Sequence, residues 1–445
     1  MSDLRDFTIS ELSRAYRNKD VSPVEVTRAY LDKLEPGKIY RSLSPERALN
    51  QAKEAEKRFQ KGISLGPLQG VPLALKDLID TEAEVTAAGS KVLAEKPAAK
   101  EDAPIAARLD AVGAVFLGKT TMTELAFSGL GLNPHFGTPG NALDETLIPG
   151  GSSSGSGVAV ASHLACAALG SDTGGSVRIP SSFNGIVGLK TSNGSIPKDG
   201  TTPLSTTLDT LGPMTRSVED AWLLWRAMAA KSVKPFEVEL AKKLRLLVPE
   251  NIILDRADEE VKTAFHRALE FYEGLGHDVI HKSLPELSEI PALYNQYGSF
   301  ASHESLALYE DMLESRGDDI DPRVAKRILE FRGRPSTDYL RLSFAQQAMS
   351  RSFWEAYRSF DAVLAPTVAI LPRKIRDLEQ NDQLYFETNG LVLRNTMLFN
   401  FLAGPATSVP CGTTATGLSV GLMVATAPHT EAHSLAIASL VENKL

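Results

Sequence analysis

The chain has 445 residues, of which 43% are hydrophobic and 23% charged, as is typical of a globular protein with a substantial buried core. Its formal net charge of −8 and its lack of a basic run argue against binding to nucleic acid or to an anionic membrane surface. The eight histidines are scattered and form no recognisable metal-binding set.

Cellular location is predicted from what the sequence lacks. The first residues, MSDLRDFTISELSRAY, contain early charges and no apolar segment of the kind found in signal peptides. No run of about 18 apolar residues indicates a membrane span. Two cysteines, Cys166 and Cys411, provide no disulfide framework, and Cys166 lies in an apolar run where it is expected to be a small buried residue. These features predict a cytoplasmic protein.

The N-terminal sixty residues have the pattern of helices. Thr8 to Glu11 and Ser22 to Glu25 both fit the capping box, in which a Ser or Thr side chain and a Glu three residues later satisfy each other's backbone N–H groups. We therefore expect a helix after Thr8 and a second helix from Ser22 to about Leu34. A third helix is expected from Pro45 to Phe59.

After residue 60, short apolar runs alternate with helical patterns. Strands are predicted at 70–76, 114–118, 244–248, 277–280 and 360–367, near 409, and at 420–424. Helices are predicted at 103–111, 121–126, 158–169, 218–231 and 258–274, and over most of 290–360. This alternation indicates an α/β fold with a partly parallel sheet. Neither an internal repeat nor a long linker divides the chain.

Two segments rich in glycine and serine interrupt this pattern. The first, PGGSSSGSG at 149–157, has the composition of a flexible linker, but it runs straight into an apolar segment. It matches neither the GxxxxGK[ST] nor the GxGxxG phosphate-binding pattern. The second is GSDTGGSVRIP at 170–180. Gly174 and Gly175 would allow successive backbone N–H groups to point at one spot, as in an oxyanion hole.

A serine next to an oxyanion hole would be a candidate nucleophile, and it would need a base. His163 lies in the apolar run and His135 in a turn, so neither has a glycine-rich context. Lys76, at the end of the apolar run VPLALK, is the better candidate, because desolvation would lower its pKa and supply a neutral amine. From the residues alone, however, a surface lysine paired with Asp77 or Asp80 is the favoured interpretation.

These segments together resemble the amidase signature family. The motifs that carry the resemblance, in chain order, are GVPLALKD, NPHFGTPGN, GGSSSGSG, GSDTGGSVRIPSSFNGIVGLK, LDTLGPMTRSVEDA, FDAVLAPT and FNFLAGPATSVPCG. The resemblance covers the chain from about residue 8 to residue 426. The resemblance implies a large mixed β-sheet covered on both faces by α-helices. It implies one amidase domain over 1–445, with its parts at 1–60 (N-terminal helices), 61–215 (signature core), 216–360 (helical covering region with some strands) and 361–445 (return to the core).

The resemblance also implies a catalytic triad and a mechanism. Lys76 matches the family's base, Ser152 its bridging serine after a cis peptide bond, and Ser176 its nucleophile. Ser176 would form an acyl-enzyme that water hydrolyses, with no cofactor and no metal. The implied oxyanion hole consists of the backbone N–H groups of Thr173, Gly174, Gly175 and Ser176.

Further positions take their expected roles from the same comparison. Ser153 would lie beside the bridging serine and help to bind substrate, and Asp172 would shape the nucleophile turn. Arg178 is expected to hold this turn by pairing with a carboxylate. The loop 126–131 corresponds to a family loop that lines the acyl pocket. Its candidate substrate contacts are Phe127, Ser128 and Gly129, although Phe127 as an ordinary core residue is an equal alternative.

The sequence departs from the family pattern after GLK, where Thr191 to Ser195 lack the common proline and arginine. This difference puts the shape of the loop in doubt, and not the triad.

The expected function is hydrolysis of a small carboxamide or related linear amide, releasing ammonia or an amine. One alternative is the glutaminase subunit of a tRNA-dependent amidotransferase, which would need partner proteins. The stretch ELAFSGLGLNPHFG is more apolar than is usual in such glutaminases and favours a free-standing enzyme. A catalytically inactive scaffold is disfavoured because all three triad positions are intact. The expected partner is a small-molecule amide, and the sequence leaves the assembly open, with a homodimer among the alternatives.

Overall fold

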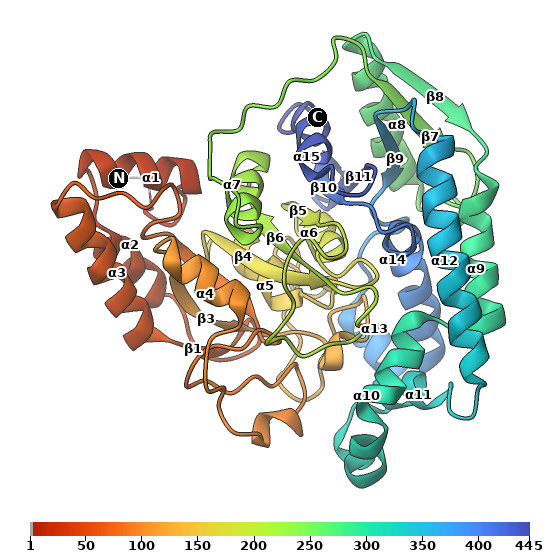
Figure 1. Cartoon of the computed structure of the whole chain (residues 1–445), viewed down its shortest axis with the longest axis horizontal. Coiled ribbons are helices and arrows are strands. Elements are labelled where there is room, and N and C mark those ends of the chain that lie inside the picture. The colour runs from red at the N-terminus through yellow and green to blue at the C-terminus, as the bar shows by residue number, and fades with distance from the viewer. Residues whose placement is uncertain (1–2) are drawn as a thin grey trace.

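The computed structural model describes residues 3–445 (Figure 1). Within these residues, eleven strands form one sheet in the order β1-β3-β2-β4-β6-β5-β10-β11-β9-β7-β8. The strands are β1 (Tyr40–Leu43), β2 (Pro72–Lys76), β3 (Val115–Thr120), β4 (Ala167–Asp172), β5 (Val187–Lys190), β6 (Thr210–Thr215), β7 (Arg245–Pro249), β8 (Asp278–Lys282), β9 (Ala362–Pro366), β10 (Ala406–Thr413) and β11 (Ser419–Ala425).

The sheet is mixed, as the expected α/β fold requires. Strand β2 is parallel to both of its neighbours, β3 and β4, and β7 is parallel to β8 and β9. Between these two parallel groups, β4, β6, β5, β10, β11 and β9 pair antiparallel in turn. Residues near the N-terminus and residues near the C-terminus therefore share one sheet.

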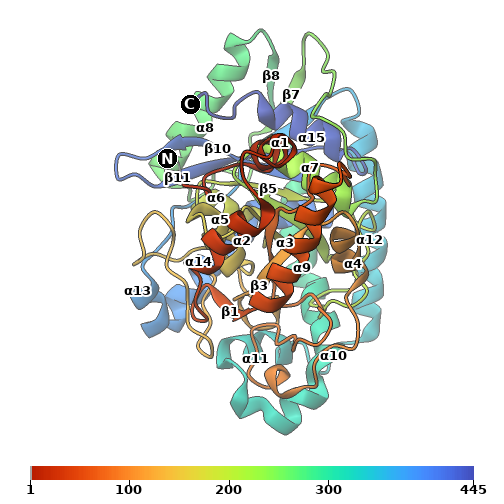
Figure 2. The same cartoon turned by 90° about the vertical axis from the view of Figure 1, so that its left-hand side faces the viewer.

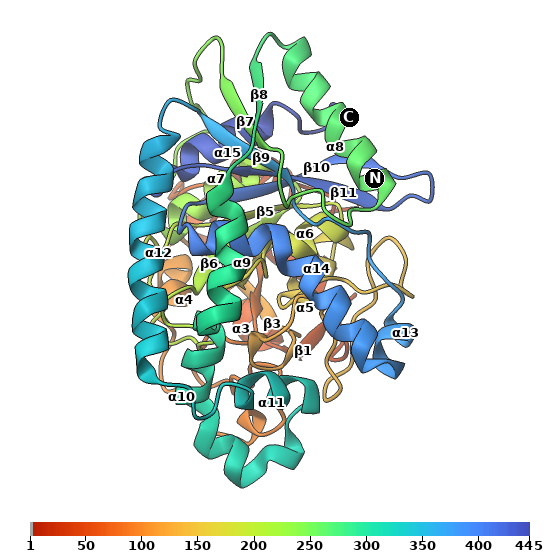
Figure 3. The ribbon, with the colours of Figure 1, turned by 90° about the vertical axis from the view of Figure 1, so that its right-hand side faces the viewer.

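Helices flank the sheet along its length. They are α1 (Ile9–Asn18), α2 (Pro23–Leu31), α3 (Pro45–Gln60), α4 (Pro104–Ala111), α5 (Ser154–Ala161), α6 (Arg178–Phe183), α7 (Val218–Met228), α8 (Glu259–Gly274), α9 (Pro285–Tyr297), α10 (Phe300–Arg316), α11 (Pro322–Leu329), α12 (Ser336–Ala356), α13 (Ile375–Gln380), α14 (Asp382–Phe401) and α15 (Glu431–Ser439). Figure 2 shows α2 and α3 over the end of the sheet that contains β1 and β3. Figure 3 shows α9, α12 and α14 on the opposite side. Within residues 3–445, no helix combines the length and apolar character needed to cross a bilayer.

The capping boxes predicted in the N-terminal region are confirmed. In α1, the Thr8 side chain accepts a bond from the Glu11 N–H, and the Glu11 side chain accepts one from the Thr8 N–H. Ser22 and Glu25 repeat this exchange at the start of α2. Since each box satisfies two otherwise unpaired N–H groups, these starts are determined locally. The end of α2 at Leu31 comes three residues earlier than predicted.

Two of the predicted helices are wrong. Instead of a helix over 158–169, α5 begins inside the serine-rich stretch at Ser154 and ends at Ala161, and the chain then enters the buried strand β4. The alanines of this run favour a helix locally, but pairing with β2 and β6 overrides that preference. The predicted helix at 121–126 is only a 3-10 turn, because Leu125 and Ala126 have positive φ angles.

Some elements were not predicted at all. The strands β1 and β5 are short, and β5 (VGLK) and β6 (TLGPMT) contain glycine or proline, which are depleted in strands. The sheet supplies the pairing that their sequences do not indicate.

The topology places three chain segments at one end of the sheet. Because β2 and β4 are parallel neighbours, their carboxyl ends, at Lys76 and Asp172, lie at the same edge. The segment before α5 approaches this edge, since α5 packs on β2, β3, β4 and β6. The turn after β4 leads directly into α6. The carboxyl ends of parallel strands commonly hold the functional site of α/β proteins.

Candidate active site

Lys76 is completely buried at the end of β2. Its Nζ lies 2.7 Å from Oγ of Ser152 and 2.7 Å from Oγ of Ser171. The alternative of a surface lysine paired with Asp77 or Asp80 is therefore wrong. The carboxylate of Asp77 forms its ion pair with Arg41 instead.

The burial of Lys76 changes its protonation. Removing an ammonium group from water disfavours the charged form, and this burial lowers the pKa of Lys76 to about 7. The negative charges of Asp209 and Asp172 act in the opposite direction but do not cancel the effect. A substantial fraction of Lys76 is therefore neutral near pH 7, as a proton acceptor must be.

Ser152 is held by a turn in which glycine is required. The peptide bond between Gly151 and Ser152 is cis, as the family resemblance implies. A side chain at Gly151 would lie 2.6 Å from the backbone nitrogen of Gly131, closer than packing permits. The Ser152 carbonyl accepts a bond from the Thr123 N–H, at 3.1 Å. The turn therefore presents the Ser152 hydroxyl to Lys76 from a fixed backbone.

Ser153 is directed toward the strand and not toward a cavity. Its Oγ donates to the Ser171 carbonyl, at 3.2 Å, and accepts from the Ser171 N–H, at 3.3 Å. Its own N–H donates to the carbonyl of Ser176, at 3.3 Å. Ser153 thus joins the cis turn to β4 and to the following turn. The structure does not place it among the residues that line the cavity.

The turn that carries Ser176 is organised by the buried carboxylate of Asp172. It accepts bonds from the N–H groups of Gly175 and Val177, and from the guanidinium of Arg178 at 2.9 and 3.0 Å. Burial alone would raise the pKa of Asp172, but the charge of Arg178 and its hydrogen bonds lower it to about 2. Arg178 thus pairs with a carboxylate, as expected, and holds the turn.

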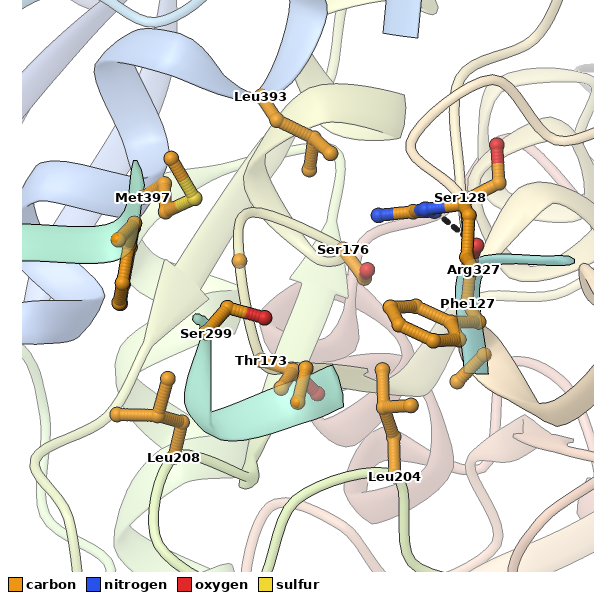
Figure 4. A pocket seen from close by; sticks show the side chains of 14 residues that line it. Phe127, Ser128, Thr173, Ser176, Leu204, Leu208, Ser299, Arg327, Leu393 and Met397 are labelled. Carbon is orange, nitrogen blue, oxygen red and sulfur yellow. Dashed lines mark hydrogen bonds between the residues drawn. The ribbon is translucent and has the colours of Figure 1, made fainter. Parts of the chain in front are cut away.

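Ser176 opens into a cavity (Figure 4). Phe127 and Ser128, two of the expected substrate contacts, also line it, whereas Gly129 does not. The Gly129 N–H and the Ser128 hydroxyl both donate to Oδ1 of Asn389. These two bonds attach the loop 126–131 to α14. The complete lining is Ala126, Phe127, Ser128, Thr173, Gly174, Ser176, Leu204, Leu208, Tyr294, Ser299, Ala301, Arg327, Leu393 and Met397.

The four N–H groups expected to form an oxyanion hole are not equivalent. The Gly175 N–H is already occupied, since it donates to Oδ1 of Asp172 at 2.8 Å. Among the hydrogen bonds of residues 3–445, none uses the N–H of Thr173, Gly174 or Ser176. Within the described chain these three N–H groups thus have no hydrogen-bond partner, and their residues line the cavity.

The hydroxyls of Ser152 and Ser176, two members of the expected triad, are not hydrogen-bonded to each other within the described chain. Neither of the two histidines considered as the base lines the cavity. His163 is partly exposed and lies 3.1 Å from Asp6, and His135 contacts Glu124 at 2.9 Å.

Sequence reasoning missed Ser171 and Arg327. Ser171 follows from the register, because a strand parallel to β2 and ending at Asp172 brings its penultimate residue near Lys76. The position of Ser171 next to Lys76 could have been predicted only if residues 167–172 had been predicted as a strand. Arg327, on α11, lines the same cavity from 151 residues after Ser176 in the sequence, and no local pattern identifies it.

Comparison with known proteins agrees with this geometry. Residues 25–435 match the Amidase family. The chain is 32% identical to the A component of the glutamyl-tRNA(Gln) amidotransferase of Geobacter sp. (strain M21), covering 99% of this chain and 98% of that protein. It is 34% identical to the 2-amino-5-chloromuconic acid deaminase of Comamonas testosteroni, covering 91% and 87%. A crystal structure of an amidase superposes with a TM-score of 0.87 at 30% identity, covering 99% of this chain and 100% of that one.

The chain therefore belongs to the amidase signature family. It is a hydrolase of this family and acts on carbon–nitrogen bonds.

Proposed function

We propose that this protein hydrolyses a small carboxamide or related linear amide through an acyl-enzyme on Ser176. The observation that carries the proposal is the contact of 2.7 Å between the buried amine of Lys76 and the hydroxyl of Ser152. This contact lies next to a turn that presents Ser176 to a cavity. A buried neutral amine bonded to a hydroxyl is an arrangement suited to proton transfer.

The first half of the reaction forms the acyl-enzyme. Neutral Lys76 accepts the proton of Ser152, and Ser152 accepts the proton of Ser176 as Oγ of Ser176 attacks the amide carbonyl carbon. This transfer requires the hydroxyls of Ser152 and Ser176 to come into hydrogen-bond contact. The free N–H groups of Thr173, Gly174 and Ser176 are placed to bind the developing oxyanion, each contributing about 3–4 kcal/mol. The Gly175 N–H supports the turn instead, through Asp172.

The second half regenerates the enzyme. The proton returns through Ser152 to the amide nitrogen, the carbon–nitrogen bond breaks, and ammonia or an amine leaves. Water then attacks the ester carbonyl, giving a proton to the relay, and the carboxylic acid is released with Oγ of Ser176 restored. Every proton and electron pair is returned, so the cycle uses only amide and water.

A second candidate is the glutaminase component of a tRNA-dependent amidotransferase. It is favoured by the full-length similarity to such a protein, at 32% identity. Against it, Ala126 and Phe127 give the cavity an apolar wall that a glutamine side chain does not need. We therefore place free-standing amide hydrolysis first.

Replacing Ser176 tests the proposal. Ser176→Ala should lower kcat/KM for amide hydrolysis by roughly 10⁴-fold or more, because the nucleophile and the proton relay act as one unit. Rapid quenching of the unmodified protein with an amide or ester should reveal by mass spectrometry an acyl group on Ser176.

Ser154→Ala is the matched control. The Ser154 hydroxyl is buried without a hydrogen-bond partner, so its removal should cost little stability or activity. Turnover that survives in Ser176→Ala, or an acyl group on another residue, would overturn the nucleophile assignment.

A further inference from the structure

The proposed relay requires Lys76 to carry a positive charge during acylation. When its amine takes the proton of Ser152, an ammonium group forms at a fully buried position. Forming a charge away from water is costly unless an opposite charge lies nearby. The surroundings of Lys76 must therefore supply a negative charge if the amine is to be an effective base.

The elements around Lys76 offer two carboxylates. On one side, α5 (SGSGVAVA) has no ionisable side chain, and on β3 the ammonium of Lys119 lies beside Asp77 instead. The two carboxylates are those of Asp172, at the end of β4, and Asp209, immediately before β6. Burial lowers the pKa of Lys76, and the charges of both carboxylates oppose this effect.

Of these two carboxylates, only Asp172 has a cation of its own. Arg178 on α6 pairs with Asp172 and donates two bonds to it, at 2.9 and 3.0 Å. Among the ion pairs within residues 3–445, none includes Asp209. Lys198, a cation of the same loop, donates to the Thr206 carbonyl instead.

The hydrogen bonds that Asp209 accepts come from neutral groups. Its Oδ2 accepts from the N–H groups of Leu204 and Ser205, at 2.9 and 3.0 Å, and its Oδ1 accepts from the Thr173 hydroxyl. Burial raises the pKa of the Asp209 carboxyl, and these three bonds act against the rise. Tyr309 on α10 also lies near, and burial raises its pKa, so it is neutral. Asp209 is therefore a carboxylate with three donors and no compensating cation.

The sheet places Asp209 at the same edge as Lys76. Strand β4 lies between β2 and β6, and the antiparallel register pairs Asp172 with Thr210, the residue after Asp209. Ser171 connects the two groups, because its Oγ lies 2.7 Å from Nζ of Lys76 and it lines a small pocket together with Asp209. Ser171 thus lies between the amine and the pocket that Asp209 faces.

We propose that Asp209 is a positioning residue whose uncompensated carboxylate stabilises the ammonium that Lys76 becomes on taking the proton of Ser152. The carboxylate keeps the amine basic enough to remove this proton, although the amine is cut off from water. This inference rests on the proposed acyl-enzyme chemistry and adds a residue to the same site.

The competing interpretation is that Asp209 only anchors the loop that carries Leu204 and the turn that carries Thr173. Asp209→Asn separates the two roles. Asparagine can direct its oxygen to the two backbone N–H groups and its NH₂ group to the Thr173 hydroxyl, so the anchor is retained while the charge is lost.

Glu304→Gln is the matched control for the anchor. Glu304 on α10 holds the same loop through the Ser205 hydroxyl and the Thr207 N–H. It is not among the charges that act on Lys76. This variant therefore weakens the loop without removing a charge from the surroundings of the base.

The first measurement is the pH dependence of kcat/KM with butanamide and benzamide, neutral amides that do not titrate near neutral pH. In Asp209→Asn the acid limb should move to lower pH by about 0.5 unit or more, because the ammonium loses its counter-charge. The plateau should fall roughly tenfold or more, because a weaker base removes the Ser152 proton less readily. Glu304→Gln should leave the limb in place. A limb that stays in place in Asp209→Asn, or moves equally in Glu304→Gln, overturns the inference.

A double-mutant cycle on stability keeps this inference separate from the proposed function. Lys76→Met and Asp209→Asn, alone and together in the Ser176→Ala background, give the coupling free energy between the two side chains. The coupling should stabilise the folded protein at about pH 6, where Lys76 is protonated, and disappear at about pH 9, where it is neutral.

The outcomes of the cycle distinguish the two proposals. If the coupling is absent at the lower pH, or unchanged at the higher pH, the Asp209 inference fails and the hydrolase proposal stands. If Ser176→Ala keeps full activity, the hydrolase proposal fails, and the cycle still decides whether Asp209 stabilises the ammonium of Lys76.

Discussion

Lys76 and Lys190 each end a strand and are each fully buried, yet their surroundings differ. Burial lowers the pKa of both to about 7. The Nζ of Lys190 donates to the carbonyls of Thr191 and Gly404, which cannot exchange protons. The Nζ of Lys76 contacts hydroxyls, which can. The same desolvation therefore produces a structural lysine in one place and a candidate base in the other.

The dependence of activity on pH follows from the lowered pKa of Lys76. Because the neutral amine is the active form, kcat/KM should rise with pH through about 7 and fall roughly tenfold per unit well below it. Lys76→Met should abolish turnover. Lys190→Met is the control, because Lys190 has the same lowered pKa. If the loss of activity at low pH disappeared in Lys190→Met, the assignment of Lys76 as the base would be contradicted.

The free energy of unfolding should also depend on pH, because the pKa of Lys76 differs between the folded and unfolded chain. The folded pKa of Lys76 lies below its ordinary value of 10.5, so between about pH 7 and 10.5 the unfolded chain binds more protons. The contribution of this group to the free energy of unfolding therefore rises with pH across that window. Below pH 7 both states are protonated and the full burial penalty applies. Denaturant unfolding should accordingly show Lys76→Met gaining stability over the unmodified protein most strongly at pH 6.

Among the elements, the loop between β5 and β6 is held to α10 by one carboxylate. Glu304 accepts bonds from the Ser205 hydroxyl at 2.5 Å, the Thr207 N–H at 3.1 Å and the Tyr339 hydroxyl at 2.7 Å. It also accepts a bond from the Thr207 hydroxyl. Glu304 is buried, so these bonds are shielded from water.

The other side of this loop is tied to the nucleophile turn. Asp209 accepts bonds from the N–H groups of Leu204 and Ser205 and from the Thr173 hydroxyl. Leu204 and Leu208, which lie between these anchors, line the cavity. Two carboxylates, Glu304 from α10 and Asp209 from the end of the loop itself, thus fix one wall of the cavity.

Glu304→Gln tests this role of the loop. Glutamine keeps the size of glutamate but replaces one acceptor oxygen with a donor, so the bonds to the loop cannot all survive. The free energy of unfolding should fall by about 1–3 kcal/mol, and KM for amides with apolar acyl groups should rise more than kcat falls.

Glu310→Gln on the same helix is the matched control. Glu310 is partly exposed and pairs with Arg332, so this change should cost less than about 1 kcal/mol. Equal losses of stability in the two variants, or unchanged KM in Glu304→Gln, would show that the loop does not depend on Glu304.

For the whole molecule, the cavity is built from segments that span residues 126 to 397 of one chain. The sheet joins β1 near the N-terminus to β11 near the C-terminus, and the covering helices complete the walls. Because the proposed nucleophile, the proposed base and the lining of the cavity all come from this chain, we predict that it needs no second polypeptide for the proposed chemistry.

The purified chain should therefore release ammonia or an amine from its substrates without another protein. A coupled ammonia assay, run beside light scattering to establish whether the chain is a monomer or a homodimer, measures this directly. Release of ammonia only after addition of a second polypeptide would favour the amidotransferase component instead.

The residues of the candidate site could be predicted to different extents. The ordered motifs predicted roles for Lys76, Ser152 and Ser176, because each lies in a short segment with a distinctive pattern. Ser171 was missed because residues 158–169 were predicted as a helix and residues 170–180 as a turn, whereas Ala167–Asp172 form β4. Ser153 was placed in the substrate site, but its side chain bonds to β4. Arg327 was missed because only the packing of α11 brings it to the cavity.

The sequence by itself determined what depends on near neighbours in the chain: the capping boxes of α1 and α2, most of the strand–helix alternation and the motif order that marks the family. The tertiary structure decided what depends on surroundings. Whether Lys76 was a surface lysine or a buried amine was open until β3 and β4 were seen to enclose β2. Desolvation is a property of everything that surrounds a group, and for Lys76 and Arg327 those surroundings come from segments far apart in the chain.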